Sequence, residues 1–337
     1  MGGGMAYRKS NGKLGRRKLQ PAVMQIAVQV PTGTSYVDLA LCASILNRRS
    51  YKQECSEWAV GSFELFKGSG VSNGIVEIRK LPQNWVMENA YTKSKALWHE
   101  MNEQVLDEQP SIAGKYRDFK IGMDVNHVAQ TIQTNANDGG RILTPIVNST
   151  GGVGNFTVAD FTGASAPRAD WEFSQLTFPN DPTSGVTTSY TMHAVGASSA
   201  DSKGLIEGYA ASRSRPQITD PNVTTINGWM NELFDDGEQL DDLKDIIEDD
   251  NNRPPYPLGN PQTATEFYVG GPNELEGLQV HSFANFTATT VSGKNTIQGG
   301  SFKCGLMRID NSTDGVISMI IHMLPGTHRG YMVEVDA

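Results

Sequence analysis

The chain has 337 residues, of which 38% are hydrophobic and only 19% are charged, and it contains 35 glycines. Low charge together with abundant Gly, Ser, Thr and Asn argues against a coiled coil and is typical of short strands joined by turns. No apolar run approaches the roughly 20 residues of a membrane-spanning helix, and no apolar stretch follows the first residues, so we expect neither membrane insertion nor a secretory leader.

The first 20 residues differ in charge from the rest of the chain. They contain six basic residues and no acidic one, so they carry +6, whereas residues 21–337 carry −15 within the total of −9. A basic segment this poor in apolar residues does not fold by itself and suits a polyanion such as nucleic acid, with a solvated tail as the alternative. The basic residues are Arg8, Lys9, Lys13, Arg16, Arg17 and Lys18.

Alternating apolar and polar residues indicate a succession of strands along the remaining chain. Residues 36–49 fit either a strand or a short helical turn. In 89–106 the apolar residues recur at intervals of four and seven, which predicts a helix with Asn89 as its N-cap and Pro110 beyond its end. The predicted strands are 24–30, 57–66, 74–80, 116–124, 186–195, 278–288 and 317–323, and 332–335 is expected to close the sheet.

Two further segments have unusual compositions. Residues 134–185 are rich in Gly, Asn, Thr, Ser and Pro without sustained periodicity, and we expect long surface loops with one or two short strands there. Residues 232–250 contain ten acidic side chains and one basic one, Lys244, with apolar residues at helical spacing, which predicts an acidic amphipathic helix. Its acidic face is either solvated or a site for a hard cation, because dense carboxylates favour such ions.

These elements together predict an all-β fold, a single jelly-roll sandwich made of two sheets. The two predicted helices are expected in connections between strands, outside the β core. The predicted organisation is a basic N-terminal arm at 1–20 and one jelly-roll domain with long surface loops at 21–337.

No motif for catalysis or for a cofactor is apparent. The six histidines are scattered, and Cys42, Cys55 and Cys304 form neither a disulfide framework nor a zinc motif. The pattern G-x-S-x-G occurs once, at residues 70–74, but a predicted strand and not a helix follows it, so it lacks the strand–turn–helix context of an esterase elbow. The Walker phosphate loop is missing from the sequence. We therefore expect that the protein is not an enzyme and requires no cofactor. The alternative is an enzyme on the same scaffold, whose titratable groups would converge only in three dimensions.

A binding module on the same scaffold is the main alternative. A carbohydrate-binding or adhesin-type β-sandwich would present exposed aromatic residues in the 134–185 loops. The candidates are Phe156, Phe161 and Trp171.

Several short segments resemble one protein family. An early motif consists of Asn47-Arg48-Arg49 followed by residues 58–63, and a more specific one runs from Leu-Pro at 81–82 to Leu-Trp at 97–98. Residues 114–120 continue the pattern, and residues 249–256 match an acidic segment that ends in Pro-Pro-Tyr. Together, over residues 44 to 260, these segments resemble capsid (coat) proteins of small circular Rep-encoding single-stranded DNA (CRESS-DNA) viruses.

The resemblance implies a viral capsid protein that self-assembles into an icosahedral shell around a single-stranded DNA genome. Its partners would be other copies of itself, the genome and an unknown host receptor. The basic arm would face inward and bind phosphates, with Arg48, Arg49 and Lys52 as additional inner-surface cations. The protein would reside in the virion after synthesis in the host cell, with the nucleus as one candidate site of assembly.

Overall fold

The computed structural model describes most of the chain outside its N-terminal arm and two long segments. The basic arm, most of 134–185 and the acidic segment 232–250 lie outside the described residues, so the predictions made for them stay predictions. The described residues are 21–54, 57–68, 70–71, 73–108, 118–132, 141–148, 154–155, 171–178, 187–213, 277–288 and 293–334.

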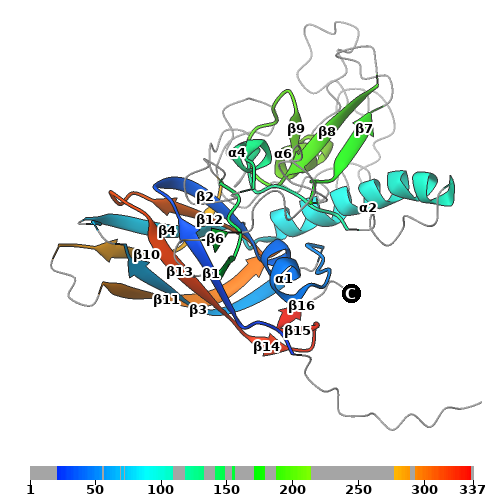
Figure 1. The fold of residues 1–337 in the computed structure, drawn as a ribbon. Coiled ribbons are helices and arrows are strands. Elements are labelled where there is room, and N and C mark those ends of the chain that lie inside the picture. The colour runs from blue at the N-terminus through cyan, green and yellow to red at the C-terminus, as the bar shows by residue number, and fades with distance from the viewer. Residues whose placement is uncertain are drawn as a thin grey trace, which may run out of the picture.

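The first of two large sheets has the strand order β1-β13-β3-β11, and all its neighbouring strands are antiparallel (Figure 1). A short last strand, β16, pairs with β3 beside Trp58, so the expected closure of the sheet near the C-terminus is confirmed. The strands are β1 (Gln25–Val30), β3 (Glu57–Lys67), β11 (Lys294–Lys303), β13 (Ile317–Met323) and β16 (Val333–Glu334).

The second sheet faces the first and has the order β10-β4-β12-β2, again antiparallel throughout. Apart from β16, the chain changes sheet at every connection between consecutive large strands except the one between β4 and β10, which stay in the same sheet. The strands are β2 (Gly33–Asp38), β4 (Gly74–Lys80), β10 (Gln279–Phe286) and β12 (Leu306–Asn311).

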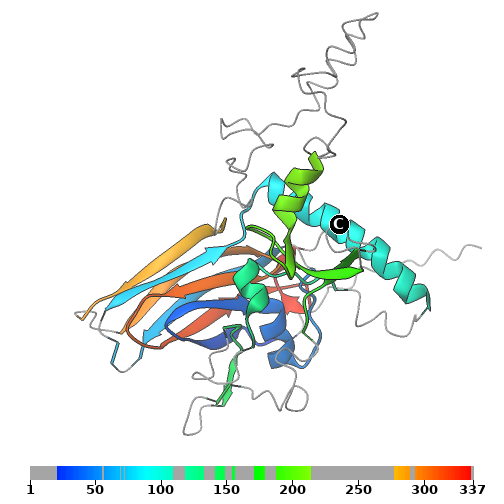
Figure 2. The ribbon, with the colours of Figure 1, turned by 90° about the horizontal axis from the view of Figure 1, so that it is seen from above.

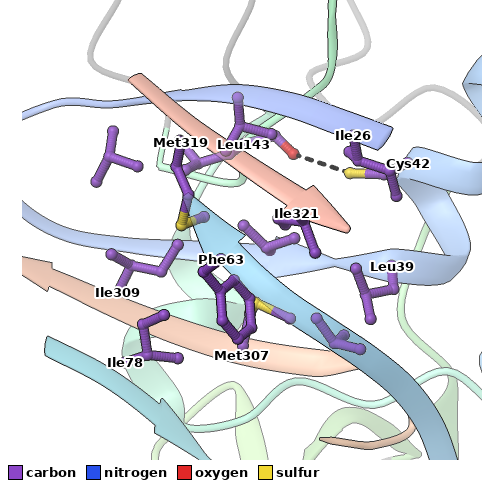
Figure 3. Packing of buried hydrophobic residues seen from close by; sticks show 14 of the residues in the cluster. Ile26, Leu39, Cys42, Phe63, Ile78, Leu143, Met307, Ile309, Met319 and Ile321 are labelled. Carbon is purple, nitrogen blue, oxygen red and sulfur yellow. Dashed lines mark hydrogen bonds between the residues drawn. The ribbon is translucent and has the colours of Figure 1, made fainter. Parts of the chain in front are cut away.

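The apolar core lies between the two sheets (Figure 3). Alternate side chains point inward: β13 buries Ile317, Met319, Ile321 and Met323 and leaves the residues between them partly exposed. Phe63 of β3 is fully buried among residues of both sheets. Large side chains of this kind each contribute about 1.5–3 kcal/mol by leaving water, so the core is the main source of sandwich stability.

A helix and a long insertion join the strands. Helix α1 (Leu39–Asn47) directly follows β2, and Asp38 caps it by accepting hydrogen bonds from two backbone N–H groups. The insertion lies between β4 and β10. Its described elements are α2 (Trp85–Glu108), α4 (Val125–Ala129), β5 (Ile146–Asn148), β6 (Gly154–Asn155), β7 (Gln175–Phe178), β8 (Thr188–His193), β9 (Ser202–Gly204) and α6 (Leu205–Arg213).

The insertion packs against the outer face of the second sheet on its β2 side. Tyr36 of β2 and Leu306 of β12 are buried in one cluster with Tyr91 of α2, Phe119 and Ile206 of α6. Figures 1 and 2 show α2 and α6 beside the sandwich and not between its sheets. The sandwich and the insertion therefore have separate apolar clusters that meet across this sheet.

Most predicted strands are confirmed, and the differences have local causes. The described part of 116–124 contains only an isolated bridge at Gly122, because Asp124 already begins α4 as its N-cap. Asn89 lies inside α2, which begins at Trp85, where the Asn84 side chain accepts the Met87 N–H over 2.9 Å. Two inserted helices were too few, since α1, α4 and α6 accompany α2.

Candidate nucleic-acid interface

The residues after α1 form an exposed basic loop, defined here as residues 48–52. Arg48 ends the helix in the left-handed conformation, with φ 52°, and its backbone N–H donates to the carbonyl oxygen of Ser44. The Arg49 N–H reaches the same carbonyl oxygen over 3.3 Å. The side chains of Arg48, Arg49 and Lys52 are exposed, so this turn presents three cations to solvent.

A fourth exposed cation comes from the other end of the sequence. Arg329 lies in the turn between β14 (Pro325–Gly326) and β15 (Gly330–Tyr331), and its guanidinium donates to the carbonyl oxygen of Ser50. In return, the Tyr51 hydroxyl donates to the carbonyl oxygen of Arg329 over 2.9 Å. The turn and the basic loop therefore hold each other, and four cations share one end of the molecule.

The polypeptide enters the sandwich at this same end. The Val23 N–H donates to Oδ1 of Asn47, the last residue of α1, over 2.9 Å, and the Tyr331 hydroxyl donates to the Val23 carbonyl oxygen over 2.6 Å. Asn47 and Tyr331 are themselves joined by a 2.8 Å hydrogen bond. The first described residues, which follow the basic arm in the sequence, therefore lie at the end of the sandwich that carries the basic loop.

An aromatic cluster supports the loop from below. The buried ring of Tyr51 lies 5.4 Å from that of Tyr331 and 6.2 Å from that of Trp58. Burial raises the pKa of the Tyr51 hydroxyl, and it raises the pKa of Tyr331 to about 12, so both remain hydrogen-bond donors at neutral pH. Burial and the neighbouring Arg329 lower the pKa of His328, which therefore adds no charge at pH 7.

Buried carboxylates fix the chain just after the loop. The backbone N–H groups of Gln53 and Glu54 donate to the two oxygens of Asp118 over 3.4 and 3.2 Å. The Gln53 amide donates to Asp38 over 3.1 Å and accepts from the Ile121 N–H over 2.6 Å. The loop is thus anchored both to the sandwich, through Asp38, and to the insertion, through Asp118.

Asp38 is the centre of this anchor and is only 1% exposed. Its oxygens accept hydrogen bonds from the N–H groups of Ala40 and Leu41, from Gln53 and from the indole of Trp171 over 2.9 Å. Burial raises the pKa of Asp38 to about 6, although these hydrogen bonds oppose the shift. The anchor is therefore charged at neutral pH and takes up a proton in mildly acidic solution.

The predicted binding residues are thus only partly placed. Arg48 and Arg49 lie together and exposed, with Lys52 beside them. Sequence reasoning missed Arg329, because Tyr51 and Arg329 are 278 positions apart and only the fold brings them together. The remaining candidates lie outside the described residues, namely Arg8, Lys9, Lys13, Arg16, Arg17 and Lys18.

The described residues give little support to a carbohydrate-binding site, a metal site or a membrane-spanning helix. Trp171 is half-buried and its indole donates to Asp38, so it is not an exposed platform for a sugar; Phe156 and Phe161 lie outside the described residues. No group of three or more His, Cys, Asp or Glu within the described ranges could hold a metal ion. None of the helices in those ranges is long and apolar enough to cross a membrane.

Comparisons with known proteins give no relative from which a function can be transferred. No family model, curated protein or solved structure matches this chain. The four cations, the anchor beneath them and the entry point of the basic arm are therefore the basis for assigning a function.

Proposed function

We propose that this chain is the coat protein of a single-stranded DNA virus of the CRESS-DNA type, which assembles into a closed icosahedral shell and packages the genome through its basic arm. The observation that carries the proposal is that the arm enters the body beside Arg48, Arg49, Lys52 and Arg329, whereas residues 21–337 as a whole carry −15. A polyanion is attracted to such a body only where cations are concentrated.

The strand pairing supports a jelly-roll body. Counting the eight large strands in chain order, the first pairs with the last (β1·β13), the second with the seventh (β2·β12), the third with the sixth (β3·β11) and the fourth with the fifth (β4·β10). This nested pairing is that of one long hairpin rolled into two facing sheets, which is the arrangement of the jelly roll used by capsid and lectin domains. The insertion occupies the tip of that hairpin.

The number of cations determines how many genome phosphates the protein can neutralise. The arm supplies six positive charges and the basic end of the body four more, so about 60 copies bring about 600 charges to the genome. Three nucleotides for each of the 337 residues require about 1,000 phosphates for this chain alone. The protein therefore neutralises only part of the genome, and we assign the remainder to small cations.

In this proposal the partners are further copies of the chain, the single-stranded genome and a host receptor of unknown nature. The protein acts in the virion after synthesis in the host cell. Binding to DNA is independent of base sequence, because the contacts are made to phosphates.

Salt-dependent binding to single-stranded DNA tests the proposal. Deleting residues 1–20 removes six of the ten cations, so the slope of log K against log salt should become less steep by about 4, at about 0.7 per phosphate contact. The sandwich should stay folded, because the deletion ends before Pro21. Equal binding by truncated and full-length proteins at low salt would contradict the proposal.

A matched pair of variants tests the basic loop separately. Arg49→Gln should make the slope less steep by about 0.7, because it removes one phosphate contact. Lys93→Gln removes one exposed positive charge from α2, which belongs to the insertion, and should leave the slope unchanged. Equal effects of the two substitutions would show that net charge governs binding and would remove the loop from the interface.

A further inference from the structure

The outer face of the second sheet carries an apolar patch at its β10 end. In the antiparallel register, Ile75 of β4 and Phe283 of β10 lie on the face opposite to the core, because their chain neighbours Val76 and Ala284 point into it. A bulge between Val280 and Ser282 turns Val280 to the same outer face, opposite Arg79. We call these three residues, Ile75, Val280 and Phe283, the β4–β10 patch.

The patch is unusually exposed. Phe283 is 64% exposed, Val280 51% and Ile75 43%, and they lie on two neighbouring strands. Elsewhere on this face, the β2 side is covered by the insertion, where Tyr36 and Leu306 are buried. Half of the face is thus covered within the chain, whereas the β10 half presents apolar side chains to solvent.

The charged side chains beside the patch neutralise one another. Arg79 Nε lies 2.7 Å from Glu77 Oε1 and 3.3 Å from Asp310 Oδ2, and Arg308 Nε lies 3.0 Å from Asp310 Oδ1. Each charged group of this row across β4 and β12 therefore has an opposite charge beside it, and Arg308 is also 3.5 Å from Asp124 of the insertion. Such a border does not attract a polyanion or an anionic membrane surface.

We infer that the β4–β10 patch is the contact surface for a second copy of this chain. Copies whose bodies each carry −15 repel one another, so a contact is favoured at a face that is apolar and whose charged groups are already paired, as they are beside this patch. Edge strands of monomeric proteins are commonly protected by lysine or proline, whereas β10 contains no charged residue and no proline. The inference rests on the proposed self-assembly and names a surface that performs it.

Phe283→Asp is the direct test. It places a negative charge in the contact, so the protein concentration needed for particles in light scattering should rise at least tenfold. The matched control is Thr296→Asp, which adds the same charge at an exposed position of β11 in the other sheet and should assemble as the wild type does. Circular dichroism and thermal unfolding confirm that both variants are folded, as expected for exposed positions.

A second measurement keeps the test independent of folding. In Phe283→Cys the introduced thiol should react with a maleimide at least ten times more slowly in particles than in dissociated subunits. The wild type gives the background of the native cysteines, of which Cys42 and Cys304 are buried. A thiol already protected in the subunits would mean that the chain itself covers the patch and would overturn the inference.

The outcomes separate the two proposals. A wild-type chain that stays monomeric at every concentration and salt condition would overturn the proposed function and this interface with it. A wild-type chain that assembles, together with a Phe283→Asp variant that assembles equally well, would overturn only the interface. Loss of assembly in both Phe283→Asp and Thr296→Asp would show that any added surface charge blocks assembly and would also overturn it.

Discussion

The sandwich and its junction with the insertion are stabilised in different ways. Between the two sheets, the buried cluster consists of apolar side chains such as Phe63 and Met319, with Ser35 of β2 as a small polar exception. At the junction, apolar residues share the buried space with the carboxylates of Asp38, Asp118 and Asp124. Since apolar packing does not titrate, whereas burial raises the pKa of Asp38 and of Asp118, the sandwich core should be insensitive to pH and the junction should respond to it.

A hydrogen-bonded network around Asp124 also crosses the junction. The Tyr36 hydroxyl of β2 donates to Asp124, whose two oxygens lie 2.8 and 3.0 Å away, and Arg308 of β12 lies 3.5 Å from the same carboxylate. The Tyr36 ring stacks on His127 of α4 at 4.3 Å. One carboxylate from the insertion thus joins two strands of the sandwich, and each member of the network can be removed separately.

The largest expected effect comes from emptying either apolar cluster. Phe63→Ala in the sandwich and Phe119→Ala under the insertion should each cost about 3–5 kcal/mol of unfolding free energy, because both rings are fully buried. Urea unfolding measures the loss. Hydrogen exchange should separate the two: Phe63→Ala should lower protection throughout, whereas Phe119→Ala should lower it first in α2 and α6.

The contrast between these variants is the informative result. Equal loss of protection in β1 and β13 for both substitutions would show that sandwich and insertion unfold as one cooperative unit. The sandwich and the insertion would then differ in the composition of their buried residues but would not unfold independently.

The junction should show its pH dependence through Asp38. Its pKa is about 6 in the folded protein against 3.8 in the unfolded chain, so its stabilising contribution is complete below about pH 4 and is lost as the pH rises through 6. Compared with Asp38→Asn, the wild type should become less stable by about 3 kcal/mol between pH 4 and pH 7. Unfolding curves of the two proteins at matched pH values measure this difference.

The comparison with Asp38→Asn is needed because His193 also contributes to the pH dependence of stability. Burial lowers the pKa of His193, so its contribution is present above about pH 6.5 and is lost as the pH falls, which is opposite in sign to that of Asp38. Both groups act near pH 6, and their effects offset one another in the wild type alone. A pH-independent difference between wild type and Asp38→Asn would contradict the assigned shift.

A smaller effect is expected from the hydroxyl that joins β2 to α4. Tyr36→Phe keeps the ring stacked on His127 but removes a donor from Asp124, which should cost about 1–2 kcal/mol. Thermal unfolding at neutral pH gives the value. A neutral result would mean that Arg308 satisfies the carboxylate without help from Tyr36.

The sandwich strands were largely predictable because their side chains alternate. In β13, four apolar residues at every second position identify both the strand and its buried face. By contrast, β11 buries few apolar residues, chiefly Ile297 and Phe302, and β12 carries Arg308 and Asp310 on its outer face, so neither was predicted. Strict alternation would put Val280 on the same face of its strand as Ala284 and Phe286, whereas the bulge after it places the side chain on the outer face, in solvent.

The candidate interface was predictable only where its residues are neighbours in the chain. Arg48 and Arg49 form a visible pair, and the basic arm is evident from its charge. Arg329 could not be found, since its place beside Ser50 depends on the pairing of strands from both ends of the chain. The anchor at Asp38 likewise joins residues from β2, the loop after α1 and Trp171. These residues are distant in the sequence, so no local sequence pattern could predict their contact.

The smallest predicted effect tests where the insertion's long helix begins. Asn84 accepts the Met87 N–H as an N-cap, so Asn84→Ala should cost about 1 kcal/mol. Asn89 lies within the helix and makes only a 3.3 Å hydrogen bond to Tyr209, so Asn89→Ala should change stability by a few tenths of a kcal/mol, because alanine favours the helix. Urea unfolding of the two variants compares the same chemical change at two positions five residues apart. A larger loss for Asn89→Ala would restore the helix start expected from periodicity alone, whereas the reverse order confirms that the cap precedes Trp85.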